Sequence, residues 1–99
     1  MIDILRVDED GRTIAEFEDA DVLKELLAGQ SSLTGCCLRF LDPYGDTTFN
    51  QLQIPVLVDE LRSIVVEVPP ALRARANALV AFIESARGEV HTYIKFMGD

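Results

Sequence analysis

Hydrophobic and polar positions alternate in two short runs at the start of the chain. Residues 2–7 (IDILRV) and 13–17 (TIAEF) follow the period of β-strands, and Asp10-Gly11 between them is typical of a tight hairpin turn. Glycine at that position takes positive φ without steric cost. The pattern therefore predicts an antiparallel hairpin.

Three later segments have hydrophobic residues spaced three and four apart, which predicts helices. The first follows Asp19, an expected N-cap, and should end at Gly29 before a loop over residues 30–34. The second should begin at Pro55, and the third should run from Pro70 to about residue 87. Their apolar stripes are Val22, Leu23, Leu26 and Leu27; Ile54, Leu57, Val58, Leu61, Ile64 and Val65; and Leu72, Ala76, Leu79, Val80, Ile83 and Ala86.

The remaining apolar segments predict further strands. Residues 35–41 should form a central strand, residues 47–50 a short return strand and residues 90–97 a last strand. The order is ββαβ(β)ααβ in a single domain, 1–99. Short links favour an α+β fold, a mostly antiparallel sheet of four to five strands with three helices on one face. Residues expected in its core are Leu38, Phe40, Leu57, Leu61, Leu79, Ile83, Ile94 and Phe96.

The densest group of hydrogen-bonding and aromatic side chains lies around a Pro-x-Gly turn in residues 41–53, LDPYGDTTFNQLQ. This segment is the best candidate in the sequence for a recognition surface. Asp42 and Asp46 could converge on a metal ion, but calcium loops need about six oxygen ligands and a closing Glu. The alternative is that Asp42 caps its own turn through its side chain. We favour this alternative and predict no metal or other cofactor.

Charge is unevenly distributed along the 99 residues, whose net charge is −8. Residues 1–25 carry nine acids against three basic residues; the acids are Asp3, Asp8, Glu9, Asp10, Glu16, Glu18, Asp19, Asp21 and Glu25. Such a field attracts basic partners and repels nucleic acid and anionic membranes. The alternative is that acidity serves solubility alone. The chain start resembles no signal peptide and apolar runs are too short to span a bilayer, so we expect a cytoplasmic protein.

Few residues offer catalytic chemistry. His91 is the only histidine and shares a predicted strand face with Tyr93. In a catalytic interpretation, His91 would be the general base and Tyr93 or Asp46 its partner. The alternative is that these residues form the solvated side of the sheet. Cys36 and Cys37 are adjacent, so in a strand they point to opposite faces; we expect reduced thiols and no zinc site.

Two motifs carry a resemblance to a known group. The segment DPYGDTTFNQLQ, residues 42–53, and the C-terminal HTYIKFMGD, residues 91–99, resemble an uncharacterised family of small bacterial proteins with a central DPYGDT-x-FN-x-LQ motif and an aromatic last strand ending in Gly-Asp. The likeness covers about half of the chain. It implies no activity, and it implies that the turn and the last strand form one unit.

The sequence therefore predicts a small acidic protein-binding module without catalysis, for example an inhibitor or immunity protein against a basic toxin. The alternatives are an adaptor or regulatory protein and a small enzyme that uses His91. The expected partner is a protein with a basic surface, not nucleic acid or a membrane. The predicted binding residues are Glu9, Asp10, Asp19, Asp42, Tyr44, Asp46, Thr47, Phe49, Asn50, Gln51, His91 and Tyr93.

Overall fold

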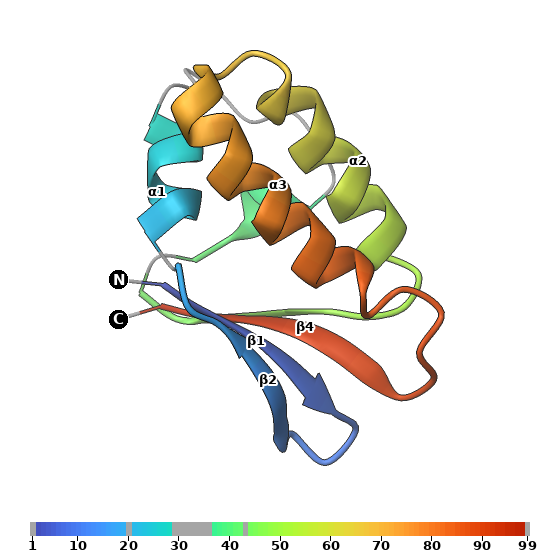
Figure 1. Cartoon of the computed structure of the whole chain (residues 1–99). Coiled ribbons are helices and arrows are strands. Elements are labelled where there is room, and N and C mark those ends of the chain that lie inside the picture. The colour runs from blue at the N-terminus through green and yellow to red at the C-terminus, as the bar shows by residue number, and fades with distance from the viewer. Residues whose placement is uncertain (1, 20, 29–36, 43, 99) are drawn as a thin grey trace.

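The computed structural model describes residues 2–19, 21–28, 37–42 and 44–98 (Figure 1). Regular structure in these residues comprises, in chain order, β1 (Asp3–Asp8), β2 (Thr13–Phe17), α1 (Asp21–Ala28), the short 3-10 helix η1 (Leu38–Phe40), β3 (Asp46–Phe49), α2 (Ile54–Val65), α3 (Pro70–Glu84) and β4 (Thr92–Met97). The predicted end of the first helix at Gly29 and the loop over residues 30–34 lie outside the described residues.

The four strands form one antiparallel sheet in the order β2-β1-β4-β3. Gly11 has a φ of 82°, which lets the chain reverse between β1 and β2 and confirms the predicted hairpin. β3 and β4 are neighbours, with Asp46 opposite Met97, and the Gly98 N–H donates to the Gly45 carbonyl at 2.8 Å. The central turn and the last strand therefore do form one unit, as the resemblance implied.

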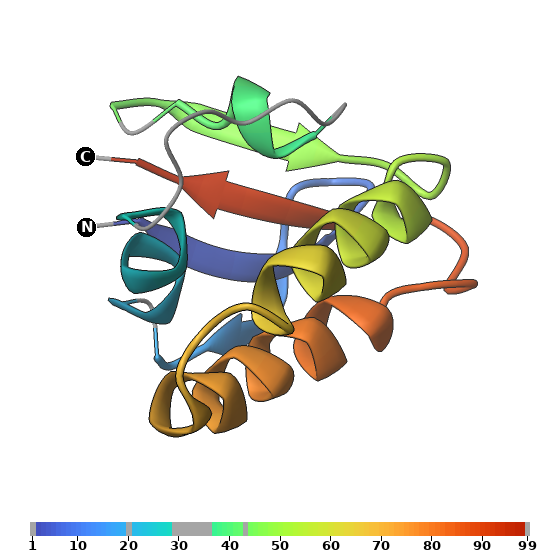
Figure 2. The ribbon, with the colours of Figure 1, turned by 90° about the horizontal axis from the view of Figure 1, so that it is seen from above.

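All three helices lie on one face of this sheet (Figures 1 and 2). Seen from the helix side, α3 crosses the half of the sheet that contains β2, and η1 lies beside β3 (Figure 2). No element of the described chain covers the opposite face. The predicted α+β class and the helices on one face are confirmed, with four strands in the described residues.

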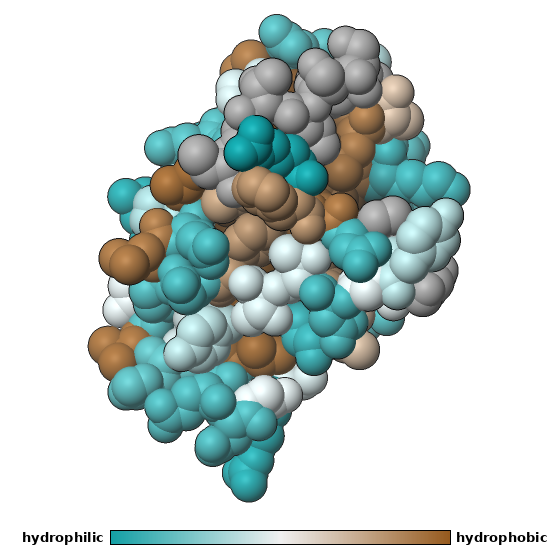
Figure 3. All heavy atoms as spheres, turned by 180° about the vertical axis from the view of Figure 1, so that it is seen from behind, coloured by the Kyte–Doolittle hydropathy of each residue, from teal (hydrophilic) through white to brown (hydrophobic). Residues whose placement is uncertain are grey.

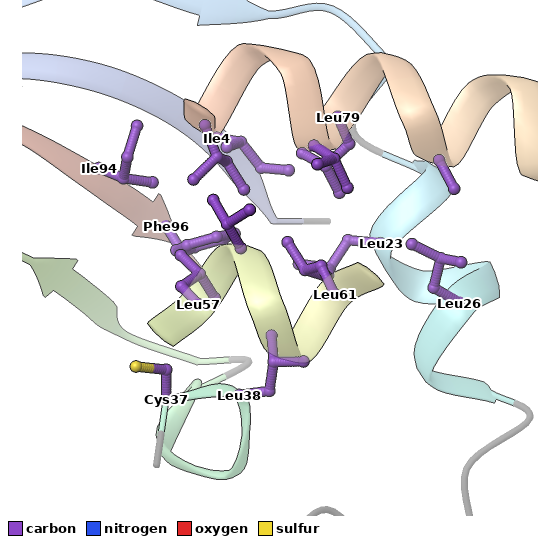
Figure 4. Close-up of a cluster of buried hydrophobic side chains, with 14 of the residues drawn as sticks. Ile4, Leu23, Leu26, Cys37, Leu38, Leu57, Leu61, Leu79, Ile94 and Phe96 are labelled. Carbon is purple, nitrogen blue, oxygen red and sulfur yellow. The ribbon is translucent and has the colours of Figure 1, made fainter. Parts of the chain in front are cut away.

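The core lies between the sheet and the helices. Side chains from β1, β4, α1, α2 and α3 point toward one another there (Figure 4). The edge-to-face ring pair of Phe49 and Phe96 lies at its β3 side, with centroids 5.7 Å apart. Seven of the eight predicted core residues are buried, namely Leu38, Leu57, Leu61, Leu79, Ile83, Ile94 and Phe96.

The predicted central strand over residues 35–41 is wrong. Its first two residues lie outside the described part of the chain, and Leu38–Phe40 form η1 instead. The carboxylate of Glu60 in α2 accepts hydrogen bonds from the backbone N–H groups of Cys37, at 3.0 Å, and Leu38, at 3.1 Å. These donors are thereby turned toward a helix and not toward a neighbouring strand. Phe40, predicted in the core, is 59% exposed as a result.

Element ends differ from the sequence prediction by a few residues. α3 ends at Glu84 and not near residue 87. β4 begins at Thr92 and not at Val90, because His91 has a φ of 59° and left-handed backbone does not continue a strand. The Cys37 side chain is buried, and its thiol donates to the Gln53 carbonyl at 3.8 Å.

Candidate functional site

The turn before β3 is held by its own polar groups. The Asp42 carboxylate accepts a hydrogen bond from the Tyr44 N–H at 2.9 Å, and the Asp42 N–H donates to the Thr47 hydroxyl at 3.2 Å. The Asp46 carboxylate lies 3.4 Å from the Lys95 ammonium. Asp42 thus caps its own turn, the alternative favoured from the sequence. Tyr44 is 83% exposed, so its ring is available to a partner.

Phe49 is a predicted binding residue that the structure places in the core. It is 3% exposed and lies opposite Ile94 on the helix side of the sheet. Because its ring packs on Phe96, it does not reach a partner on the surface. Its role as a contact residue is therefore corrected to one in packing.

Asn50 and Gln53 form a reciprocal cap where the chain enters α2. The Asn50 side-chain oxygen accepts hydrogen bonds from the N–H groups of Leu52, at 2.9 Å, and Gln53, at 3.1 Å. The Asn50 N–H in turn donates to the Gln53 side-chain oxygen at 2.9 Å. This is the geometry of a capping box. Asn50 therefore has a structural role that accounts for its side chain.

Gln51 connects two loops at the same end of the molecule. Its amide nitrogen donates to the carbonyls of Ala86, at 3.0 Å, and Thr92, at 2.8 Å. Its side-chain oxygen accepts from the Gly88 N–H at 3.0 Å. The side chain satisfies three backbone groups of the loop between α3 and β4, and so fixes that loop against the start of α2.

His91 lies at this end as well, beside the hairpin tip. Its Nδ1 atom is 3.0 Å from the Glu9 carboxylate, and both side chains are largely exposed. Asp46 pairs with the far end of β4, about 20 Å from His91 by the rise of a strand. The predicted catalytic pair of His91 and Asp46 is therefore not formed.

The guanidinium of Arg75, a residue of α3, binds the carboxylate of Asp19, which lies just before α1. This carboxylate accepts hydrogen bonds from Arg75 at 2.7 and 2.9 Å, and Arg75 also contacts Glu25 at 2.6 Å. The hydrogen bond from Arg75 is the largest cause that lowers the pKa of Asp19, and the backbone N–H of Val22 adds to it. Asp19 and Glu25 reciprocally raise the pKa of Arg75.

The predicted binding residues thus do not converge on one site. Glu9, Asp10 and His91 lie at the hairpin end of the sheet, whereas the turn containing Tyr44 and the start of α1 lie at the other end. The five residues of β2, about 17 Å of strand, separate the hairpin acids from Asp19. The lower end in Figure 3, where the hairpin turns, is mostly hydrophilic.

One surface that the sequence analysis missed is the uncovered face of the sheet. Leu5 and Val7 point to this face, yet they are only 8% and 4% exposed. The signal was present in the adjacent pair Ile4-Leu5, because consecutive apolar residues in a strand indicate apolar surroundings on both faces. Tyr93, a predicted binding residue, lies opposite Val7 on the same face and is half-buried.

Comparisons with protein-family models, curated proteins and solved structures find no match for this chain. Among the described residues, no group of three or more His, Cys, Asp or Glu side chains is placed to hold a metal ion. None of the helices in that part of the chain has the length and apolar character needed to span a membrane.

Proposed function

We propose that the chain is a small acidic protein-binding module of the cytoplasm, which covers a basic surface of its partner in the manner of an inhibitor or immunity protein. The observation that carries this proposal is the arrangement of its exposed acids. In the described residues, the carboxylates of Asp10, Glu16, Glu18 and Asp21 have no ion pair or side-chain hydrogen bond. They are fully available to an external cation.

These acids follow the chain from the tip of the first hairpin along β2 to the start of α1, and no cation of the described chain neutralises them. Asp10 is at the hairpin tip, Glu16 is on edge strand β2, and Glu18 and Asp21 flank the start of α1. Charges in water act over about 10 Å at ordinary salt, so the fields of Glu16 and Glu18, two residues apart, add, whereas Asp10 at the far end of β2 attracts cations separately. Such charges steer a basic protein into contact and raise its association rate.

The exposed position of His91 also favours binding over catalysis. His91 and its partner Glu9 are 65% and 56% exposed. A general base works best with a reacting group held in a site that excludes water, and neither side chain is in such a place. An adaptor or regulatory role uses the same surfaces, and the identity of the bound protein would distinguish it from inhibition.

Affinity capture tests the proposal. The immobilised chain is exposed to a lysate of its native cell at low salt, with nuclease present, and bound proteins are identified by mass spectrometry. We expect a protein with a basic surface that is released by added salt, since exposed charge pairs are screened. Capture that requires nucleic acid, or no protein above the background of an unrelated acidic bait, would contradict the proposal.

A matched pair of variants separates local charge from net charge. Asp10→Asn with Glu18→Gln removes two acids from the hairpin side, and Asp59→Asn with Glu67→Gln removes two from α2 and the turn after it. All four carboxylates are exposed, and both variants change the net charge equally. The first variant should recover clearly less partner than the second. Equal recovery would show that overall charge alone is responsible.

A further inference from the structure

The face of the sheet opposite the helices has a regular arrangement of apolar and acidic side chains. Strand pairing aligns its residues in three rows across the sheet. From one end to the other, the rows are Asp3, Met97 and Asp46; Glu16, Leu5, Lys95 and Thr48; and Val7 and Tyr93, where the register between β1 and β2 shifts.

The centre of this face is apolar. Leu5 and Val7 lie outside the hydrophobic cluster beneath the helices, so their low exposure comes from neighbours on their own face. Met97 and Tyr93, beside them on β4, are half-buried. A sheet face that only meets water usually alternates to polar side chains, and these four residues depart from that rule. An apolar centre with a polar border is the usual anatomy of a protein-binding surface.

The border of the face is acidic. Asp3 and Glu16 are exposed, and neither carboxylate has an ion pair within the described chain. Lys95 is the one cation in the three rows, and it is engaged by Asp46 at 3.4 Å. The partner must therefore supply positive charge at one end of the apolar centre, near Asp3, and along its β2 side, near Glu16.

We propose that this face is the docking surface for the basic partner, which lays apolar side chains over the half-buried Tyr93 and Met97, beside the buried Leu5 and Val7, and cations beside Asp3 and Glu16. This inference rests on the proposed function, because it assigns the binding of the basic partner to this face of the sheet. Charge identifies the occupant as a basic protein segment. A second copy of this chain would place acid against acid, and the phosphates of nucleic acid would meet the same carboxylates.

Amide-resolved NMR tests the site with a probe of defined chemistry. The 15N-labelled chain is titrated with an amphipathic peptide of Lys and Leu, and in parallel with a Glu and Leu peptide of the same pattern. The basic peptide should shift the amides of Leu5, Val7, Tyr93 and Lys95, and the acidic peptide should leave them in place. Shifts confined to the hairpin tip or the start of α1, or no shifts at all, overturn the docking site.

Two lysine variants test the site without disturbing the core. Thr48→Lys adds a cation to the uncovered face, and Ala78→Lys adds one to the exposed side of α3. Thr48→Lys should weaken binding of the basic peptide by about fivefold, the upper range for one exposed charge pair. Ala78→Lys should have no measurable effect. Equal weakening by both variants would show that only long-range charge matters and would overturn the proposal.

Two tyrosine variants compare the face with the turn. Tyr93→Ala removes a half-buried ring from the face, and Tyr44→Ala removes the exposed ring of the turn. Loss of an interface aromatic commonly lowers affinity about tenfold or more, so Tyr93→Ala should do so and Tyr44→Ala should not. The reverse result moves the site to the turn. Affinity capture by the wild-type chain would still support the proposed function in that case, so the two claims fail separately.

Discussion

Arg75 in α3 donates two hydrogen bonds to the carboxylate of Asp19, at 2.7 and 2.9 Å, and so joins the segment before α1 to the helix above it. A bidentate pair of this kind fixes both distance and orientation. Glu25, one turn into α1, contacts the same guanidinium at 2.6 Å. An acid that the sequence suggested for recognition therefore orients α1 against α3.

The Asp19–Arg75 pair predicts a pH-dependent stability. Arg75 lowers the pKa of Asp19 in the folded chain below its unfolded value of about 3.9. The pair should therefore stabilise the fold above about pH 4, and the contribution should disappear as pH falls through the lowered folded-state pKa. Asp19→Asn should lower the urea midpoint near pH 7 and have little effect in strong acid. Asp59→Asn, on the outer side of α2, is the control and should show no such difference.

Gln51 should matter for stability because it satisfies three backbone groups. Gln51→Ala should cost about 1–3 kcal/mol, because it removes three hydrogen bonds, two of them to part-buried carbonyls. The amide of Gly88 should also exchange faster with solvent. Its neighbour Leu52 is 85% exposed, and Leu52→Ala should change stability by less than about 0.5 kcal/mol. An unchanged denaturation midpoint for Gln51→Ala would refute the role of this side chain.

Truncation of Leu61 should destabilise the fold much more than truncation of Phe40. Leu61 is 0% exposed in the core, and Leu61→Ala should cost about 2–5 kcal/mol. Phe40 is 59% exposed, with the Arg39 guanidinium 4.7 Å from its ring centre, and Phe40→Ala should cost less than about 1 kcal/mol. Urea denaturation of both variants measures the difference. Equal losses would mean that the face of one of these residues is misassigned.

Local sequence patterns were sufficient for the elements with a single apolar face. The stripe that includes Leu57 and Leu61 gave α2 within one residue at its start, and Asp10-Gly11 gave the hairpin. The segment from 35 to 41 failed because its alternation resembles a strand, whereas its backbone is set by Glu60 in a distant helix. A contact between residues so far apart in sequence leaves no periodic signal.

The recognition surface was harder to predict for a related reason. Polar residues crowd the segment from 42 to 53, but Asp42, Asn50 and Gln51 bind the protein's own backbone. Composition does not distinguish such internal hydrogen bonds from those offered to a partner. The uncovered face is assembled from four strands, and only their order and register bring its residues together.

The salt dependence of association distinguishes electrostatic steering by the exposed acids from a role in solubility alone. The rate constant for association with the captured protein is measured at low and high salt, for the wild-type chain and for the variant Asp10→Asn with Glu18→Gln. We expect a slower and less salt-dependent association for the variant, with dissociation nearly unchanged, because peripheral charges act mainly on encounter. Association rates that agree between the two proteins at every salt concentration would contradict recognition through the exposed acids Asp10 and Glu18.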